Sequence, residues 1–319
     1  MADSTEGDTD VQYLGLLVPT LIVLIVGLVI HSFTIGVNVT DWRKRRLVTP
    51  VDHIVTSLGI SRMCAQCANI LLLFINPLFG RNLDLSITLI IGSGYDFFMY
   101  ANMWLTSLLS FVLCLKISNF HNSLFMYLKR VIVHRTTYFI GASVLLSAVN
   151  SLITLLLAIP NISSDVTYNT TMGNLFMDCM YIDSVYHVTI GVFFPPLSYC
   201  ISSVLLFISL HHHTTKMKRS KNLSINLETY YSVMKFVSVT FIYNTVYFIF
   251  YILYYYVYCV SPAWLCIILD FLPVLHSSYL IYRTAKLRSQ ISKVLQTVMD
   301  FVFQNKNTET RENIEVVAL

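Results

Sequence analysis

The sequence predicts an all-α membrane protein, a seven-transmembrane helix bundle with a short amphipathic helix after the seventh span. Three observations predict this fold. The 319 residues are 55% hydrophobic and only 12% charged, whereas a soluble domain carries about 25% charged residues. Seven apolar segments are each long enough to cross a bilayer, which takes about 20 residues. The Lys and Arg residues lie almost entirely in alternate segments between these spans and in the C-terminal tail.

The distribution of positive charge predicts the orientation of the bundle. Of the 21 Lys and Arg residues, all but Arg62 and Arg81 fall in four clusters, and the positive-inside rule places such clusters in the cytoplasm. The N-terminus is acidic and lacks the basic region that opens a cleaved signal peptide. We therefore expect a multi-pass plasma-membrane protein with its N-terminus outside and its C-terminus inside. The expected parts are an extracellular N-terminus (1–10), a seven-transmembrane bundle (11–283) and a cytoplasmic amphipathic helix and tail (284–319).

A basic block separates the first two spans. The first span, residues 11–37, ends shortly before Trp42-Arg-Lys-Arg-Arg46, a block that suits contact with the lipid bilayer and not with nucleic acid. The second span, residues 51–78, contains Arg62 about ten residues from its cytoplasmic end. An arginine inside a span is costly. Arg62 therefore either joins a structural or switching network or extends its side chain to the inner headgroups.

The third span, residues 85–115, has an outer half that mixes polar, aromatic and sulfur-containing side chains. Several of them recur at helical spacing and so share one face, with Asp96 beside it. This face predicts one wall of a ligand pocket, although the same side chains also suit packing between helices. The face holds Tyr95, Met99 and Asn102 or Met103.

The fourth span, residues 138–159, is rich in small residues that permit close helix contact, and we expect Pro160 to end it. The following outside loop carries two glycosylation sequons, at Asn161 and Asn169. Two further sequons would face the cytoplasm and stay unmodified: Asn38 and Asn222.

The fifth span, residues 185–210, is kinked by Pro195 and Pro196 and has His187 in its outer turns. Three consecutive histidines follow, at 211–213. Consecutive side chains splay around a helix, so these histidines predict a solvated helix end and not a metal site.

The sixth span, residues 230–258, is dense in aromatic residues. Tyr247 and Tyr251 are four residues apart and lie deeper than the tyrosines of the outer interface, so they predict a second pocket wall with hydroxyl groups.

The seventh span, residues 263–282, contains Asp270, and an intramembrane carboxylate is by default a candidate functional residue. Residues 285–298 alternate basic and apolar side chains at helical spacing, which predicts an amphipathic helix on the inner membrane surface. We expect the polar remainder of the tail to be disordered.

No catalytic signature is present. The sequence contains no GxSxG, HExxH or glycine-rich phosphate loop, so we expect neither an enzyme nor a cofactor or metal. The seven cysteines have no metal-site spacing. Cys179 and Cys259 fall in outside loops, where they either form a disulfide or stay free. The intramembrane ionisable residues form no evident relay and the halves show no internal symmetry, which disfavours a coupled transporter. A receptor fits best.

Four stretches carry motifs of one family: Leu58-Gly-Ile-Ser-Arg62; Trp104-Leu-Thr-Ser-Leu-Leu-Ser-Phe through Leu115-Lys-Ile-Ser-Asn-Phe120, followed by Leu128-Lys-Arg130; Ser202-Ser-Val-Leu-Leu-Phe-Ile-Ser-Leu210 with His213-Thr214 and Met217; and His276-Ser-Ser-Tyr-Leu-Ile281 with Lys286-Leu287. Together they resemble type 2 taste receptors, the bitter receptors. They follow the predicted order of spans, so the resemblance covers nearly the whole chain.

The resemblance implies a G-protein-coupled receptor that binds bitter small molecules in an outer intramembrane cavity and activates a gustducin-type heterotrimeric G protein. It favours Asn161 over Asn169 as the glycosylation site. Many members have Trp and Asn where this chain has Tyr95 and Met99, so their ligand preferences do not carry over, whereas Tyr247 matches a frequent pocket tyrosine. The alternatives are a vomeronasal type 1-like pheromone receptor and, in a different class, a membrane transporter.

Two sets of site residues follow. The expected agonist contacts are Tyr95, Asp96, Met99, Asn102, Met103, His187, Tyr247, Tyr251, Cys266 and Asp270. The residues expected to contact the G protein or to control activation are Arg62, Lys116, His213, Lys216, His276 and Lys286. Within this second set, Arg62, Lys116 and His276 are expected at similar depths on spans two, three and seven.

Overall fold

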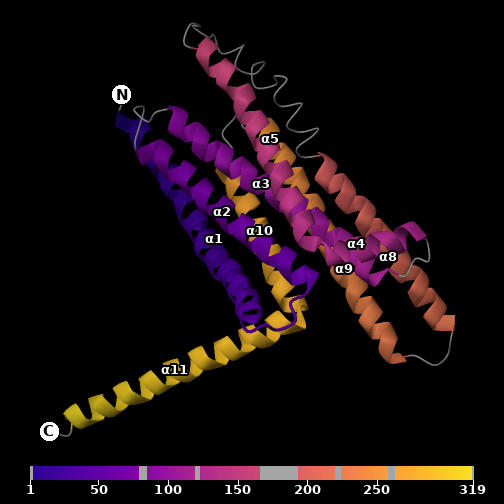
Figure 1. Cartoon of the computed structure of the whole chain (residues 1–319). Coiled ribbons are helices and arrows are strands. Elements are labelled where there is room, and N and C mark those ends of the chain that lie inside the picture. The colour runs from indigo at the N-terminus through magenta and orange to yellow at the C-terminus, as the bar shows by residue number, and fades with distance from the viewer. Residues whose placement is uncertain are drawn as a thin grey trace. The chain divides into compact units, whose positions relative to one another are not determined.

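The computed structural model describes residues 3–78, 85–118, 123–165, 193–219, 224–257 and 263–317, and nearly all of them are helical (Figure 1). The helices are α1 Asp3–Arg43, α2 Pro50–Leu78, α3 Leu85–Ile117, α4 Ser123–His134, α5 Thr136–Asp165, α8 Phe194–Arg219, α9 Ser224–Val257, α10 Ala263–Arg283 and α11 Ala285–Val317.

Six helices in the described part of the chain are long and apolar enough to cross a membrane. Their apolar stretches are Leu17–Arg43, Pro50–Leu72, Leu89–Ile117, Thr136–Leu156, Phe194–His212 and Tyr231–Leu253. They confirm a multi-pass helical membrane protein and correspond to the first six predicted spans. Helix α10 matches the predicted seventh span to within one residue but is not among the six, so a seventh crossing stays a prediction.

The chain divides into two compact units, Met1–His276 and Ser277–Leu319. In the first unit α3 is the central helix, because it packs against α2, α5 and α8. The membrane-spanning stretch of α3 is 72% buried, against 22% for those of α1 and α5. Apolar side chains on the outer helices, such as Ile25, Leu145 and Ile242, are exposed, as expected where the surrounding solvent is lipid.

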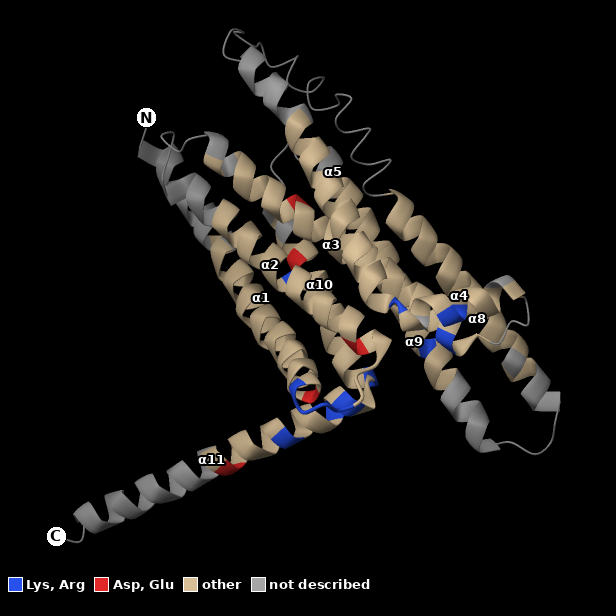
Figure 2. Ribbon diagram, in the orientation of Figure 1, with Lys and Arg blue, Asp and Glu red and all other residues tan. Residues whose placement is uncertain are grey.

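Positive charge is concentrated at the helix ends. In Figure 2 the Lys and Arg residues of the first unit gather after α1 and on α4, not along the middle of the helices. Arg62 is the exception within the bundle and is buried.

Two boundaries differ from the sequence predictions. The basic segment after α3 was expected to be a loop, but it contains α4, on which Ile132 is buried and Met126 and Tyr127 are exposed. Apolar residues spaced three to four apart give this short segment one apolar face, which packs on the core beside α3. Helix α5 passes through Pro160 and ends at Asp165, since a proline inside a helix can kink it without ending it.

The second unit differs from prediction as well. The expected short helix over residues 285–298 is the first part of α11, which continues to Val317 through the segment expected to be disordered. No glycine or proline interrupts residues 285–319, and Lys, Glu, Gln and Arg are good helix formers.

Gly27 of α1 permits a close approach to α2. A Cβ at this position would lie 2.8 Å from the Cδ of Gln66. Gln66 is only 2% exposed, and its Nε2 donates a hydrogen bond to the backbone oxygen of Asp270 at 3.2 Å. We expect Gly27→Ala to displace Gln66 and to destabilise the protein by about 1–3 kcal/mol, measured as a lower melting temperature in detergent. Gly36→Ala on the same helix is the matched control, because its Cβ meets nothing within 4 Å. Equal melting temperatures for the two variants would contradict this interpretation.

Candidate functional site

Buried Arg62 on α2 is the centre of a polar network. Its side chain is directed into the bundle and not toward headgroups, and the residue is 2% exposed. The guanidinium donates from Nε to Oδ1 of Asn102 on α3 at 2.8 Å and from Nη1 to the carbonyl oxygen of Pro273 on α10 at 3.3 Å. Its Nη2 lies 2.9 Å from Nδ1 of His276. Arg62 thus connects α2 to α3 and α10.

His276 has a defined role in this contact. A guanidinium can only donate, so Nδ1 of His276 accepts and the ring proton lies on Nε2. That nitrogen is buried and has no hydrogen-bond partner among the described residues. The ring stacks on Tyr243 of α9, with centroids 4.4 Å apart and planes inclined by 5°.

The network continues from Asn102 to α9. Nδ2 of Asn102 donates to the Tyr247 hydroxyl at 3.2 Å, and that hydroxyl donates to the Met99 sulfur at 3.3 Å. The two ends of the Asn102 amide are therefore divided between Arg62 and Tyr247. A change at either partner alters the geometry available to the other.

Asp270 belongs to a different contact. Nδ2 of Asn69 donates to Oδ2 of Asp270 at 2.5 Å, and Gln66 donates to its backbone oxygen at 3.2 Å. Both partners lie on α2. The structure therefore places this carboxylate, expected to contact agonist, at the packing surface between α2 and α10.

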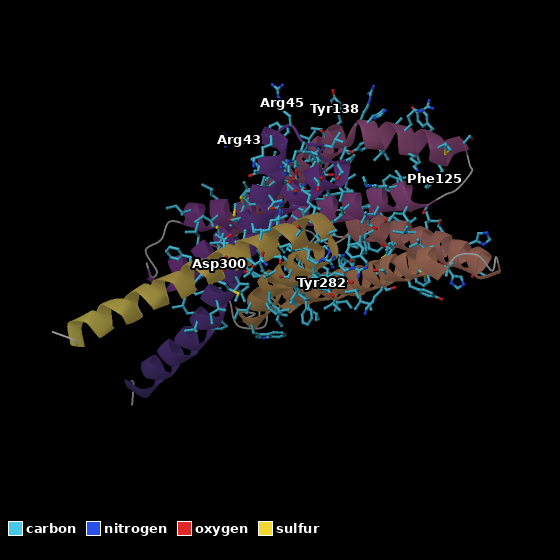
Figure 3. The ribbon with its side chains drawn as sticks, turned by 90° about the horizontal axis from the view of Figure 1, so that it is seen from below. Arg43, Arg45, Phe125, Tyr138, Tyr282 and Asp300 are labelled. Carbon is cyan, nitrogen blue, oxygen red and sulfur yellow. The ribbon has the colours of Figure 1, made fainter. Side chains whose placement is uncertain are left out.

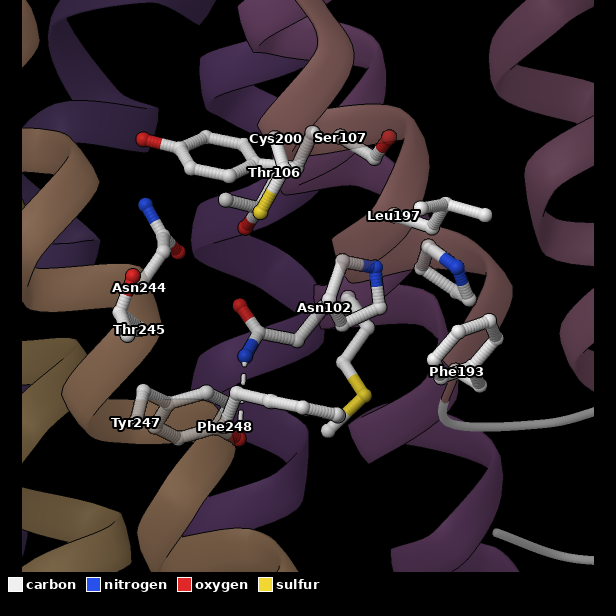
Figure 4. A pocket seen from close by; sticks show the side chains of 14 residues that line it. Asn102, Thr106, Ser107, Phe193, Leu197, Cys200, Asn244, Thr245, Tyr247 and Phe248 are labelled. Carbon is white, nitrogen blue, oxygen red and sulfur yellow. Dashed lines mark hydrogen bonds between the residues drawn. The ribbon is translucent and has the colours of Figure 1, made fainter. Parts of the chain in front are cut away.

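A cavity of about 180 Å³ that is partly open to its surroundings lies between α3, α8 and α9. Figure 4 shows that amide, hydroxyl and aromatic groups converge on it, with Asn102 bonded to Tyr247 at one side. A largely apolar wall with a few placed polar groups is typical of small-molecule sites. The lining residues are Asn102, Met103, Thr106, Ser107, Phe193, Pro195, Pro196, Leu197, Tyr199, Cys200, Asn244, Thr245, Tyr247 and Phe248.

Three expected agonist contacts line this cavity: Asn102, Met103 and Tyr247. The others do not. Tyr95, Met99 and Tyr251 are buried in an apolar cluster with Leu269, and Asp96 is half-buried outside that cluster. Cys266 lies on α10, and His187 falls outside the described residues.

Sequence reasoning missed the α8 wall and much of the α9 wall. Asn244 could have been recognised from the sequence as a cavity residue. It is an amide in an apolar span, and it precedes Tyr247 by three residues and so shares its helix face. Serines provide another signal. Ser107 contacts Ser198, and Ser110 lies 2.8 Å from Ser202 and 3.0 Å from Ser203 through the side-chain oxygens. Such hydroxyl pairs join α3 to α8 beside the cavity.

The residues expected to control activation are dispersed. Arg62 and His276 meet as described, but Lys116 is exposed on the last turn of α3. His213 and Lys216 lie near the end of α8, and Lys286 lies on α11 in the second unit. Of the glycosylation sites, Asn161 lies in the last turns of α5 and Asn169 is outside the described residues.

Comparison with known proteins covers most of the chain. A family model described as taste receptor protein (TAS2R) matches residues 10–299. Taste receptor type 2 member 140 of Rattus norvegicus is 28% identical over 216 residues, 64% of this chain and 66% of the relative. Member 2 of Homo sapiens is 27% identical over 231 residues, 70% of this chain and 75% of the relative. Member 143 of Mus musculus is 28% identical over 238 residues, 70% of this chain and 78% of the relative. The protein therefore belongs to the taste receptor type 2 family that its sequence motifs resemble.

Proposed function

We propose that the protein is a G-protein-coupled receptor that binds bitter small molecules in the cavity between α3, α8 and α9. One observation carries the proposal. Asn102 lines the cavity and also accepts a hydrogen bond from Arg62, which contacts two residues of α10. A ligand that contacts Asn102 at the cavity wall thus contacts the direct hydrogen-bond partner of Arg62, which joins α2 to α3 and α10.

The proposed signal begins at the Asn102 amide. An agonist with a hydrogen-bond acceptor competes with Tyr247 for Nδ2 of Asn102 and so biases the position of Oδ1, which Arg62 contacts at 2.8 Å. The shift in Arg62 then changes how firmly α2 holds Pro273 and His276. An agonist stabilises the rearranged state only to the extent that it binds that state more tightly than the resting state.

The proposed output is activation of a gustducin-type heterotrimeric G protein at the basic end of the bundle. The four positive clusters favour the cytoplasm for this end. Its proposed contact residues are Lys116, His213, Lys216 and Lys286. Helix α4, which follows Lys116 in the chain, adds the exposed Arg130. In this orientation the receptor lies in the plasma membrane and its N-terminus is extracellular.

A calcium-release assay tests the function. Cells expressing the receptor with a gustducin-type chimeric G protein are challenged with a panel of bitter compounds, and we expect concentration-dependent calcium release absent from untransfected cells. Silence across the panel despite confirmed surface expression would count against a bitter receptor. Compound flux without G-protein activation would instead support the transporter alternative.

Glycosylation tests the orientation. We expect glycosidase treatment to reduce the apparent mass of the receptor. Asn161→Gln or Ser163→Ala should remove this mass shift if Asn161 alone is glycosylated. Either variant should leave a smaller shift if Asn169 is glycosylated as well. Asn38→Gln should leave the apparent mass unchanged, because the proposed orientation places the Asn38 sequon at the cytoplasmic side, where it stays unmodified. A glycan at Asn38 would invert the proposed orientation.

A further inference from the structure

A second hollow, of about 320 Å³, lies between α1, α2 and α5, and it shares no residue with the cavity described above. Part of its volume is open to the surroundings. It lies where α1 ends and where α2 and α5 begin. Its lining residues are Asn38, Val39, Trp42, Val48, His53, Thr56, Ser57, Ile60, Thr137 and Ile140.

The hollow has a polar end and an apolar end. His53 is in the first turn of α2, whereas Ile60 lies two turns further into the membrane, about 10 Å along the helix. Ile140 of α5 and the exposed face of Ile60 supply apolar surface at this depth. Trp42 is 68% exposed at the other end, as is common for an indole ring at a membrane interface. This arrangement matches a phospholipid, which has a polar headgroup at one end and apolar acyl chains at the other.

Positive charge lies directly beside the polar end. Residues 43–46 are four consecutive cations, and they connect Trp42 to the Val48 segment, both of which line the hollow. Arg135 precedes the lining residue Thr137 by two positions and is exposed. Figure 3 shows Arg43, Arg45 and Tyr138 projecting outward at the same edge of the first unit.

Few carboxylates compensate this charge. Arg46 forms an ion pair with Asp41 at 3.1 Å, and Asp52 accepts hydrogen bonds from the amide and hydroxyl of Thr49 at 2.9 Å. Among the residues that the structure describes, Arg43, Lys44 and Arg45 have no carboxylate partner. The mouth of the hollow therefore carries a net positive charge.

We propose that this hollow binds one anionic glycerophospholipid from the leaflet that the basic end faces. The phosphate and headgroup lie against residues 43–45, and one acyl chain follows Ile60 and Ile140. Charge complementarity selects an anionic over a zwitterionic lipid, since each cation near a membrane surface favours acidic lipids. A bound lipid would connect α1, α2 and α5 at their ends and so stabilise the first unit.

Native mass spectrometry of the full-length receptor in detergent tests this site. The receptor is titrated with phosphatidylserine or with phosphatidylcholine of the same acyl chains, and we expect at least about tenfold tighter binding of phosphatidylserine. Two variants should remove this preference: Arg43→Gln with Lys44→Gln and Arg45→Gln, which neutralises the mouth, and Ser57→Trp, which fills the hollow. The conservative variant Arg43→Lys with Arg45→Lys should retain it.

Two controls separate the site from general membrane attraction. Lys129→Gln with Arg130→Gln removes charge from α4 outside the hollow, and Ile22→Trp adds an indole on the exposed face of α1. Both should keep the preference for phosphatidylserine. Equal binding of the two lipids by the unmodified receptor overturns the proposal. Full phosphatidylserine binding by Ser57→Trp also overturns it, because the charges alone would then suffice.

Discussion

Replacing Arg62 with alanine is expected to abolish agonist-evoked signalling and to destabilise the receptor. The substitution leaves two buried acceptors without their donor, Oδ1 of Asn102 and Nδ1 of His276. It also removes a second hydrogen bond from the carbonyl oxygen of Pro273, which lies inside α10. Each unsatisfied buried group costs about 1–3 kcal/mol, so the melting temperature of the purified receptor should fall. The connection between the cavity wall and α10 is lost at the same time.

Two further variants, one at Arg62 and one at the neighbouring residue, serve as controls. Arg62→Lys retains the charge, but a single ammonium cannot reproduce the planar fork that reaches acceptors on two helices, so we expect only partial recovery of signalling. Ser61→Ala removes one hydrogen bond, to the backbone oxygen of Phe98 at 2.7 Å, and should have a small effect. Basal and evoked signalling are compared at equal surface level. If Arg62→Ala leaves both unchanged, the network has no part in activation.

Replacing Cys200 with tryptophan is expected to abolish the response to every agonist that uses the cavity. Cys200 of α8 lines this space together with Thr106 and Asn244 (Figure 4), and an indole would occupy much of it. Calcium release is measured against agonist concentration. The expected result is loss of the maximal response, or a large increase in the concentration required, at unchanged surface level.

The neighbouring residue supplies the control. Ile201 is 54% exposed on the outer face of α8, so Ile201→Trp adds the same side chain where it meets lipid. It should respond as the unmodified receptor does. A full response from Cys200→Trp would move the agonist site away from this cavity, toward the outer half of α3 where Tyr95 and Asp96 lie.

The spans were predictable because length and composition determine them. Twenty apolar residues have few alternatives to crossing a bilayer, and α2 and α3 begin and end within about two residues of their predicted limits. Helix α4 was not recognised because its 12 residues are too few to register as a span. Pro160 was expected to end its span, but α5 continues through it, since a proline inside a helix can kink it without ending it.

The site was less predictable because depth along a helix does not determine its rotation. Counting residues placed Arg62 and His276 at one depth, and they do meet although 214 positions separate them. The same count included Lys116, which is exposed on the last turn of α3. Asp270 was expected to contact agonist, but it is buried and its carboxylate accepts a hydrogen bond from Asn69 on α2. Rotation depends on packing with neighbouring helices, which one sequence does not reveal.

The hydroxyl pairs between α3 and α8 have a mechanical consequence. Ser110 lies within hydrogen-bond distance of both Ser202 and Ser203, so one α3 hydroxyl already has two alternative partners on α8. A small displacement of α8 relative to α3 can therefore weaken one of these hydrogen bonds while the other is kept. Interlocked branched side chains would resist such a displacement, whereas small serines allow it. The contact between α3 and α8 can thus adjust slightly without leaving the Ser110 hydroxyl unpaired.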